Sequence, residues 1–166
     1  AAFGSMRICE MIRQEICYPK LNVKIACSHG GVTPANDGAS HQCIEDMGIM
    51  RTLPNMTVVM PADYTSAKAL VKAAAAWDGP VYLRFTRDAV PVIYDEEDTF
   101  EIGKAKILRE GGDVTLIANG DTVRLALEAA DNLQKKGISA RVLDMHTIKP
   151  LDEKAVLDCI RSTKAI

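Results

Sequence analysis

The sequence predicts an α/β protein made of two units, each with a mostly parallel sheet flanked by helices. Short apolar runs rich in β-branched residues alternate with segments whose apolar residues recur every three or four positions. Strands that alternate with helices in this way are typical of parallel sheets covered by helices. Prolines and acidic residues interrupt the pattern at 89–101, which predicts a linker between a first unit at 1–88 and a second at 102–166.

The first unit is expected to contain three strands and three helices. In order, they are a helix with Ile8, Ile12 and Ile16 on one face, a strand at 23–27, a helix with Ile44, Met47 and Met50 on one face, a strand at 57–60, a helix capped by Asp63, and a strand at 81–85. The dipeptide Tyr18-Pro19 should end the first helix, because proline disfavours helical backbone in the residue before it.

The second unit is expected to begin with a hairpin. In order, its elements are strands at 105–109 and 114–118 joined across Glu110–Asp113, a helix at 122–136 with Leu125, Leu127, Ala130 and Leu133 on one face, a strand at 140–143, and a last helix opened by Pro150-Leu151-Asp152. Gly137 is the expected end of the middle helix, since glycine readily adopts the left-handed backbone found there.

Composition excludes several classes of function. With 166 residues and 48% hydrophobic content the chain can bury a sizeable core, and its net charge of −2 gives no electrostatic case for nucleic acid or an anionic membrane. No apolar run reaches transmembrane length and no signal peptide is visible. The five cysteines form no CxxC pair, which favours free thiols in a reducing cytoplasm. The chain starts without Met and ends as a new apolar run begins, so we expect a piece of a longer protein.

Polar side chains with catalytic chemistry gather after two of the predicted strands. His29 follows the strand at 23–27, Asp37 lies in an Asn-Asp-Gly turn, and His41 precedes the next helix. Arg87 follows the strand at 81–85. Because ligands in open α/β sheets sit at the carboxyl ends of strands, we expect these four side chains to surround one cavity.

This set of groups suits a polar, phosphorylated small molecule. Imidazoles exchange protons with hydroxyls near pH 7, and a guanidinium binds phosphate through two parallel hydrogen bonds. The N-terminus of the helix near His41 could also help to hold an anion. The competing interpretations are hydrogen-bonded loop histidines, an ordinary turn aspartate, and a surface Arg87 paired with Asp88. A zinc or iron site at His29, Asp37 and His41 is a further alternative, although the spacing matches no HExxH pattern.

Long ordered stretches resemble the transketolase family. The run from Leu21 to Asp63, LNVKIACSHGGVTPANDGASHQCIEDMGIMRTLPNMTVVMPAD, resembles the pyrimidine-binding domain, above all that of the C-terminal subunit of two-chain transketolases. Gly79 to Arg87 resembles the last strand of that domain, and Arg141 to Asp152 resembles the transketolase C-terminal domain. The resemblance covers essentially the whole chain and implies a partial pyrimidine domain of the thiamin-diphosphate-binding type followed by a partial C-terminal domain.

The resemblance implies an enzyme that transfers a two-carbon ketol unit between sugar phosphates with thiamin diphosphate. By position, His29 would lie beside the substrate phosphate and Asp37 would contact a substrate hydroxyl. His41 would bind a substrate oxygen near the reacting carbon or the phosphate end, and Arg87 would bind phosphate. His29 and His41 are therefore the expected catalytic residues.

The resemblance also implies a cofactor pocket that this chain only partly supplies. Phe3 matches an aromatic residue that packs on the aminopyrimidine ring, and Met6 stands where some members have a tyrosine. We expect no metal ligand in this chain, because the family binds magnesium and diphosphate with another domain. The family's catalytic glutamate would lie before Phe3, and Asn36 replaces one acid of the family's turn.

These departures leave other readings open. The expected partners are sugar phosphates and a diphosphate-binding domain or subunit in a homo- or hetero-oligomer, such as a dimer, within a cytoplasmic pentose phosphate pathway. Alone, the chain should be inactive, since active sites of the family form between subunits. The alternatives are a non-catalytic assembly module of the same fold and another thiamin diphosphate enzyme, such as deoxyxylulose-phosphate synthase.

Overall fold

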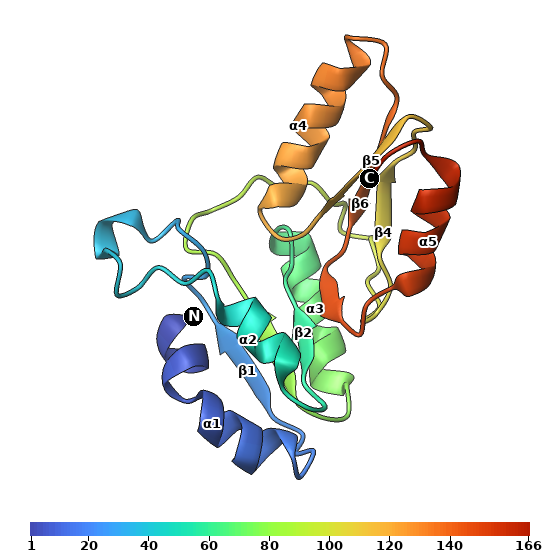
Figure 1. Cartoon of the computed structure of the whole chain (residues 1–166). Helices are drawn as coiled ribbons and strands as arrows, with labels where there is room; N and C mark the ends of the chain where they lie inside the picture. The colour runs from blue at the N-terminus through green and yellow to red at the C-terminus, as the bar shows by residue number, and fades with distance from the viewer.

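The α/β class is confirmed by a computed structural model that describes all of residues 1–166 (Figure 1). The larger sheet contains, in spatial order, β1 (Lys24–Cys27), β3 (Val81–Arg84), β2 (Thr57–Val59) and β7 (Thr147–Lys149). The smaller sheet contains, in spatial order, β4 (Lys106–Arg109), β6 (Ala140–Asp144) and β5 (Val114–Ala118). Most of the strands that periodicity predicts are therefore present.

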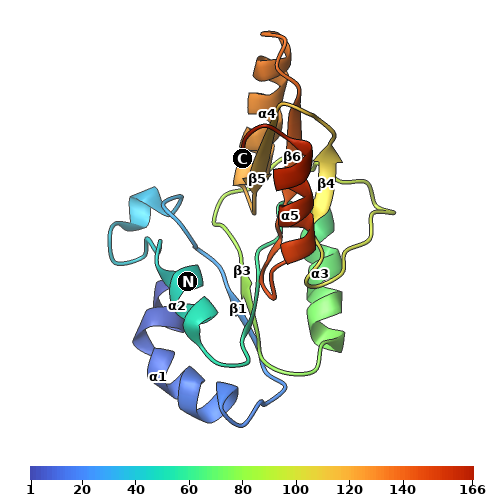
Figure 2. The ribbon, with the colours of Figure 1, turned by 45° about the vertical axis from the view of Figure 1, so that its right-hand side comes forward.

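Helices cover the larger sheet on both faces. They are η1 (Phe3–Arg7), α1 (Cys9–Met11), η2 (Ile12–Cys17), α2 (Asp46–Thr52) and α3 (Tyr64–Ala76), whereas the short η3 (Ala35–Asp37) lies in the loop between β1 and α2. The helix expected from the isoleucine repeat is present and ends before Tyr18, with π-helical stretches at η1 and η2. In the two views, α1 and α2 lie on one side of this sheet and α3 lies on the other (Figures 1 and 2).

Burial on two faces explains the apolar composition of the central strands. β1, β3 and β2 run parallel, and Val81, Tyr82 and Leu83 of β3 are all buried. Tyr82 packs in the cluster under η2 and α2, whereas Val81 and Leu83 pack in the cluster under α3. Alternate residues of a strand point to opposite faces, so a strand covered on both sides needs apolar residues throughout.

One carboxylate both caps α3 and anchors the predicted linker. Oδ1 of Asp63 accepts a hydrogen bond of 2.8 Å from the backbone N–H of Ser66, which confirms the expected N-cap. Oδ2 accepts from the backbone N–H groups of Ile93 and Tyr94 at 2.8 and 3.0 Å. The segment 89–101 contains no helix or strand but is tied to the larger sheet through this contact.

The second unit contributes a strand to the larger sheet. β7 pairs antiparallel with β2, and Lys149 donates hydrogen bonds to the carbonyls of Arg51 and Leu53 at 3.0 and 2.6 Å. Sequence reasoning missed β7 because its three residues, Thr147 to Lys149, include only one apolar side chain and form no apolar run. The boundaries 1–88, 89–101 and 102–166 remain a prediction, and β7 shows that residues on either side of them share one sheet.

The expected hairpin between β4 and β5 is wrong. β6 lies between them, antiparallel to β4 and parallel to β5. The turn that precedes β5 is bound to β6 instead, because Asp113 exchanges backbone and side-chain hydrogen bonds of 2.9 and 2.8 Å with Ser139. Gly111 allows this close approach, since a Cβ there would lie 2.3 Å from the carbonyl carbon of Ala140.

The structure corrects two of the helix predictions and confirms a third. α2 begins at Asp46, so Ile44 lies outside it with 72% of its surface exposed, and His41 does not lie at the start of a helix. In α4 (Thr122–Gln134) the buried residue near the start is Val123, whereas Leu125 is half exposed. α5 (Glu153–Ser162) opens as predicted, with Asp152 accepting from the backbone of Ala155.

A buried polar cluster joins the linker to the smaller sheet. The hydroxyl of Tyr94 donates a 2.7 Å hydrogen bond to Oδ2 of Asp144, whose side chain is fully buried. Burial raises the pKa of the Asp144 carboxyl to about 7. Two residues later, burial, aided by the nearby Lys106 ammonium, lowers the pKa of His146 to about 4. These two groups therefore link folding to pH.

The pKa shifts of Asp144 and His146 are expected to have opposite effects on stability as the pH changes. Asp144 holds its proton more tightly in the folded chain, so its contribution to stability is lost as pH rises from about 4 to 7. Unfolding lets His146 take up a proton below its ordinary pKa of 6.5, so its contribution is lost as pH falls from 6.5 to about 4. In the shared window the two slopes have opposite signs.

Removing either group should reveal how the other group alone makes the free energy of unfolding depend on pH. We expect the free energy of unfolding of Asp144→Asn to rise with pH between about 4 and 6.5, relative to the unsubstituted chain, and that of His146→Gln to fall. Each slope should change by at most about 1.4 kcal/mol per pH unit. Urea unfolding followed by circular dichroism at several pH values measures this, and identical slopes in all three proteins would contradict it.

Candidate functional site

The candidate site lies at the carboxyl ends of two neighbouring strands. β1 and β3 pair in parallel, with Cys27 beside Arg84, so the segments that follow them leave the same edge of the sheet. His29 follows β1 and Arg87 follows β3. The long loop between β1 and α2, which contains η3, projects from this edge (Figure 1).

Three of the four predicted side chains contact one another. Oδ2 of Asp37 lies 3.4 Å from Nε of Arg87 and 4.0 Å from Nε2 of His29. Arg87 also pairs with Asp88, with 3.6 Å between Nη1 and Oδ1. The side chains of His29, Asp37 and Arg87 keep 42%, 34% and 40% of their surface exposed, so a ligand can reach all three. Exposed ion pairs add little to stability, so this cluster is not explained as a structural brace.

The fourth side chain, His41, joins the group through a small cavity. A pocket of about 290 Å³ is lined by Phe3, Ser28, His29 and His41, together with the first two alanines. The rings of Phe3 and His41 meet edge to face, with 5.3 Å between their centroids. Because His29 borders both the pocket and the charged cluster, the two form one continuous site.

The aromatic wall of this pocket is open to solvent. Phe3 is 45% exposed, and the guanidinium of Arg7 lies over its ring at 4.5 Å from the centroid. Met6, on the same turn of η1, is also exposed but does not line the pocket. An exposed aromatic ring beside two imidazoles is suited to a flat heterocycle that carries hydrogen-bonding groups.

A buried ion pair beneath the loop supports this arrangement. Nε of Arg84 lies 3.0 Å from Oδ2 of Asp46, which also accepts a 2.8 Å hydrogen bond from the hydroxyl of Tyr82. Burial and this carboxylate raise the pKa of the Tyr82 hydroxyl. Gly30 lies against the guanidinium, where a Cβ would be 2.4 Å from Nε of Arg84. Sequence reasoning missed this pair, although a charged residue inside an apolar strand was a visible signal.

His29 has an unusual backbone conformation. Its φ of +63° lies in the left-handed region, which is uncommon for residues other than glycine. The next residue, Gly30, donates a 3.0 Å hydrogen bond to the carbonyl of Phe85 beyond β3. Strained backbone of this kind persists where the surroundings impose it, and it clusters at functional sites.

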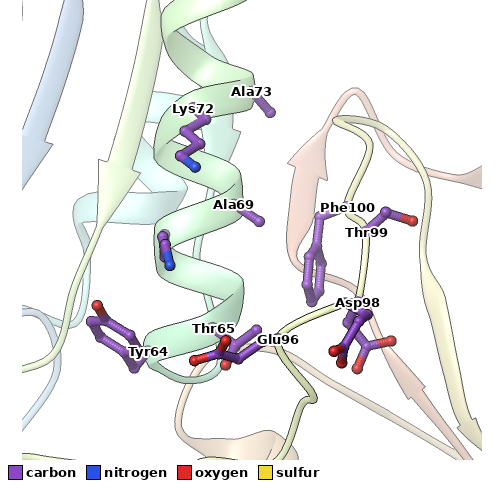
Figure 3. Close-up of a pocket in the computed structure, with 11 residues that line it drawn as sticks. Tyr64, Thr65, Ala69, Lys72, Ala73, Glu96, Asp98, Thr99 and Phe100 are labelled. Atoms are coloured by element: carbon purple, nitrogen blue, oxygen red, sulfur yellow. The ribbon is translucent and has the colours of Figure 1, made fainter.

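A larger cavity lies elsewhere and contains none of the predicted residues. It has a volume of about 540 Å³ and runs between α3 and the linker. Figure 3 shows Ala69 and Ala73 of the helix pointing toward the linker, on which Asp98 and Phe100 lie. Its walls carry no imidazole or thiol, so residue chemistry, rather than volume, favours the pocket at His29 and His41.

Three general features of the chain bear on the alternatives. No group of three or more His, Cys, Asp or Glu side chains is close enough together to hold a metal ion. All five cysteines are free thiols. None of the helices combines the length and apolar character that crossing a membrane requires.

Both halves of the chain match known protein families. Residues 1–93 match the family described as transketolase, pyrimidine binding domain, and residues 103–166 match the family described as transketolase, C-terminal domain. These matches cover the residues of the candidate site and of both sheets.

Individual relatives agree with the family matches. The chain is 50% identical to a putative transketolase C-terminal section of Methanocaldococcus jannaschii over 93% of its length and 49% of the relative. It is 45% identical to the 6-deoxy-6-sulfo-D-fructose transketolase subunit SqwH of Clostridium sp. over 99% of its length and 51% of the relative. The chain thus spans about half the length of the curated relatives it matches.

A solved structure shares the fold closely. It is described as a split gene transketolase, inactive beta4 tetramer, and superposes with a TM-score of 0.90 at 47% identity. The superposition covers 98% of this chain and 52% of that one.

The strain at His29 can be measured by comparing two substitutions. Both His29→Gly and His29→Ala remove the imidazole, but only alanine keeps a Cβ in the left-handed region. We expect the glycine variant to be more stable by about 1 kcal/mol in urea unfolding. His41 is the matched control because its φ is not positive, so His41→Gly should be no more stable than His41→Ala. Equal stability of the two His29 variants would contradict the assigned strain.

Proposed function

Because this chain belongs to the transketolase family, we propose that it forms part of an enzyme that transfers a two-carbon ketol unit between sugar phosphates. The observation that carries the proposal is the convergence of His29, Asp37 and Arg87 beside the aromatic pocket of Phe3 and His41. A charged cluster next to an aromatic wall offers one region for the sugar phosphate and another for a flat cofactor ring.

Arg87 and His29 are the proposed contacts for the anionic end of the sugar. The guanidinium is permanently charged and can bind a phosphate through parallel N–H groups. Asp37, 3.4 Å from Nε of Arg87, accepts hydrogen bonds only, so it can hold the guanidinium and accept from a sugar hydroxyl. One relative is named for a sulfonated fructose, which also bears an anionic group.

The exposed ring of Phe3 fits the aminopyrimidine of thiamin diphosphate. When bound, this cofactor supplies carbanion chemistry, which protein side chains alone do not provide. Phe3 would hold the ring by aromatic contact, and Met6, which is exposed on the same turn of η1 but outside the pocket lining, would add an apolar contact at its border. Magnesium and the diphosphate are assigned to a partner domain or subunit.

The two histidines act on the substrate oxygens in this proposal. Both line the pocket beside Phe3, where a sugar bound by Arg87 would present its hydroxyl and carbonyl groups. Their N–H groups would orient these oxygens and stabilise negative charge that develops on them. The roles assigned to His29, Asp37, His41, Arg87, Phe3 and Met6 are part of the proposal.

The proposed enzyme contains a diphosphate-binding subunit and more than one chain. This is supported by the relatives described as a C-terminal section and as a subunit, and by the solved relative described as an inactive beta4 tetramer. The five free thiols are in keeping with a cytoplasmic enzyme, which we assign to pentose phosphate interconversion. A dimeric unit with its site at the subunit boundary is the proposed arrangement.

The chain should need its partner for activity. In a coupled assay with xylulose 5-phosphate, ribose 5-phosphate, thiamin diphosphate and magnesium, we expect no turnover from the chain alone. We expect turnover after addition of a diphosphate-binding transketolase subunit. Turnover by the chain alone would contradict the proposed partner, and continued inactivity with cofactor bound to the assembly would favour a non-catalytic module.

Arg87 should matter for phosphorylated substrates in particular. In the assembled enzyme, Arg87→Ala is expected to raise KM for a ketose phosphate by roughly 10- to 100-fold, the cost of losing hydrogen bonds to a charged group. The KM for the corresponding sugar without phosphate should change little. Arg124→Ala is the matched control, because Arg124 pairs with Glu128 on the exposed face of α4. An equal effect on both sugars would contradict the phosphate contact.

A further inference from the structure

Both histidines of the site are preceded by a serine that contacts the same ring nitrogen. Oγ of Ser28 lies 2.8 Å from Nδ1 of His29, and Oγ of Ser40 lies 2.9 Å from Nδ1 of His41. The two pairs come from opposite ends of the long loop, and Ser28, His29 and His41 line one pocket. With a serine at Nδ1, Nε2 is the ring nitrogen left to meet a ligand or, at His29, the carboxylate of Asp37.

We propose that Ser28 and Ser40 are positioning residues that hold His29 and His41 in the tautomer with the proton on Nε2. Each serine hydroxyl donates its hydrogen bond to Nδ1, and each histidine then presents an N–H donor to the cavity. The assignment of the tautomer rests on geometry alone, whereas its consequence for catalysis rests on the proposed function.

The surroundings of His29 decide which nitrogen carries the proton. A neutral imidazole has one donor and one acceptor nitrogen, and a serine hydroxyl can serve either. Nε2 of His29 faces the carboxylate of Asp37 at 4.0 Å, and a carboxylate can only accept. The field of that carboxylate favours a proton on Nε2. Nδ1 is then the acceptor, and the Ser28 hydroxyl must be the donor.

The serine contact at Nδ1 recurs at His41, although no carboxylate pairs with this ring. Its Nδ1 is occupied by Ser40, and the ring of Phe3 lies on another side at 80° to the imidazole plane. These two contacts restrict rotation of the ring about both of its side-chain bonds. Nε2 is left without a protein hydrogen bond and is available to a substrate oxygen.

This tautomer gives the two histidines a defined chemical role. With the proton on Nε2, each ring donates to a substrate oxygen and stabilises negative charge there. If the ring gains a second proton, Nδ1 becomes a donor and the serine hydroxyl must rotate to accept from it. The serine can make this change without leaving its place, so the ring keeps its orientation through a proton transfer.

Nuclear magnetic resonance can test the assignment because the chain has only three histidines. We propose long-range ¹H–¹⁵N spectra of the ¹⁵N-labelled 166-residue chain at about pH 8.5, where ordinary imidazoles are neutral. Both site histidines should show the tautomer protonated on Nε2. His146, buried beside Thr147 outside the site, serves as the internal reference.

Serine variants give the decisive comparison. Ser28→Ala should change the tautomer ratio of His29 alone, and Ser40→Ala that of His41 alone. The expected change is about fivefold, the ratio that a hydrogen bond of about 1 kcal/mol produces. Ser28→Thr and Ser40→Thr keep the hydroxyl and should keep the ratio. Unchanged ratios in both alanine variants, or a proton on Nδ1 in the unsubstituted chain, would overturn the proposal.

Kinetics of the assembled enzyme separate this proposal from the proposed function. Ser40→Ala should lower kcat/KM by about tenfold, less than the hundredfold that a misplacement of about 1 Å can cause, and Ser40→Thr should restore it. If the tautomers respond to the serines but the assembly transfers no ketol unit, the proposed function fails and the positioning stands. If ketol transfer proceeds and alanine and threonine variants behave alike, the positioning fails.

Discussion

The buried ion pair between Asp46 and Arg84 is the interaction on which the rest of the site depends. It joins the first residue of α2 to the last residue of β3, and the hydroxyl of Tyr82 completes the coordination of the carboxylate. Burying two charges is costly, and removing one partner of such a pair typically costs about 3–5 kcal/mol, because the other charge is left uncompensated. The fold therefore keeps both partners in place.

The same guanidinium fastens both ends of the functional loop. Gly30 lies directly against it, and Nη2 donates a 3.3 Å hydrogen bond to the carbonyl of Cys43. Gly31 and Cys43 also pair through backbone hydrogen bonds of 2.6 and 3.0 Å. The loop that carries His29, Asp37 and His41 is thus closed at its base, while its tip remains exposed.

Different charges stabilise the loop and are proposed to bind the substrate. The charges that hold the loop are buried, whereas the charges proposed to bind substrate keep a third or more of their surface exposed. Exposed pairs contribute little to folding, so ligand groups can replace them at small cost. The linker is built in the same way, because the buried carboxylate of Asp63 anchors it while Glu96 and Glu97 stay exposed.

The sequence by itself determined the elements whose signals are local. Apolar runs predicted β1, β2, β3 and β6, capping aspartates predicted the starts of α3 and α5, and long motifs identified the family. Tertiary structure alone decided which strands pair, because β6 lies between β4 and β5, and β7 crosses to the other sheet. It also brought Arg87 to Asp37 and His29, since parallel strands align their ends through hydrogen bonds between residues far apart in the chain. Local patterns carry no information about such pairings, which depend on the packing of the whole chain.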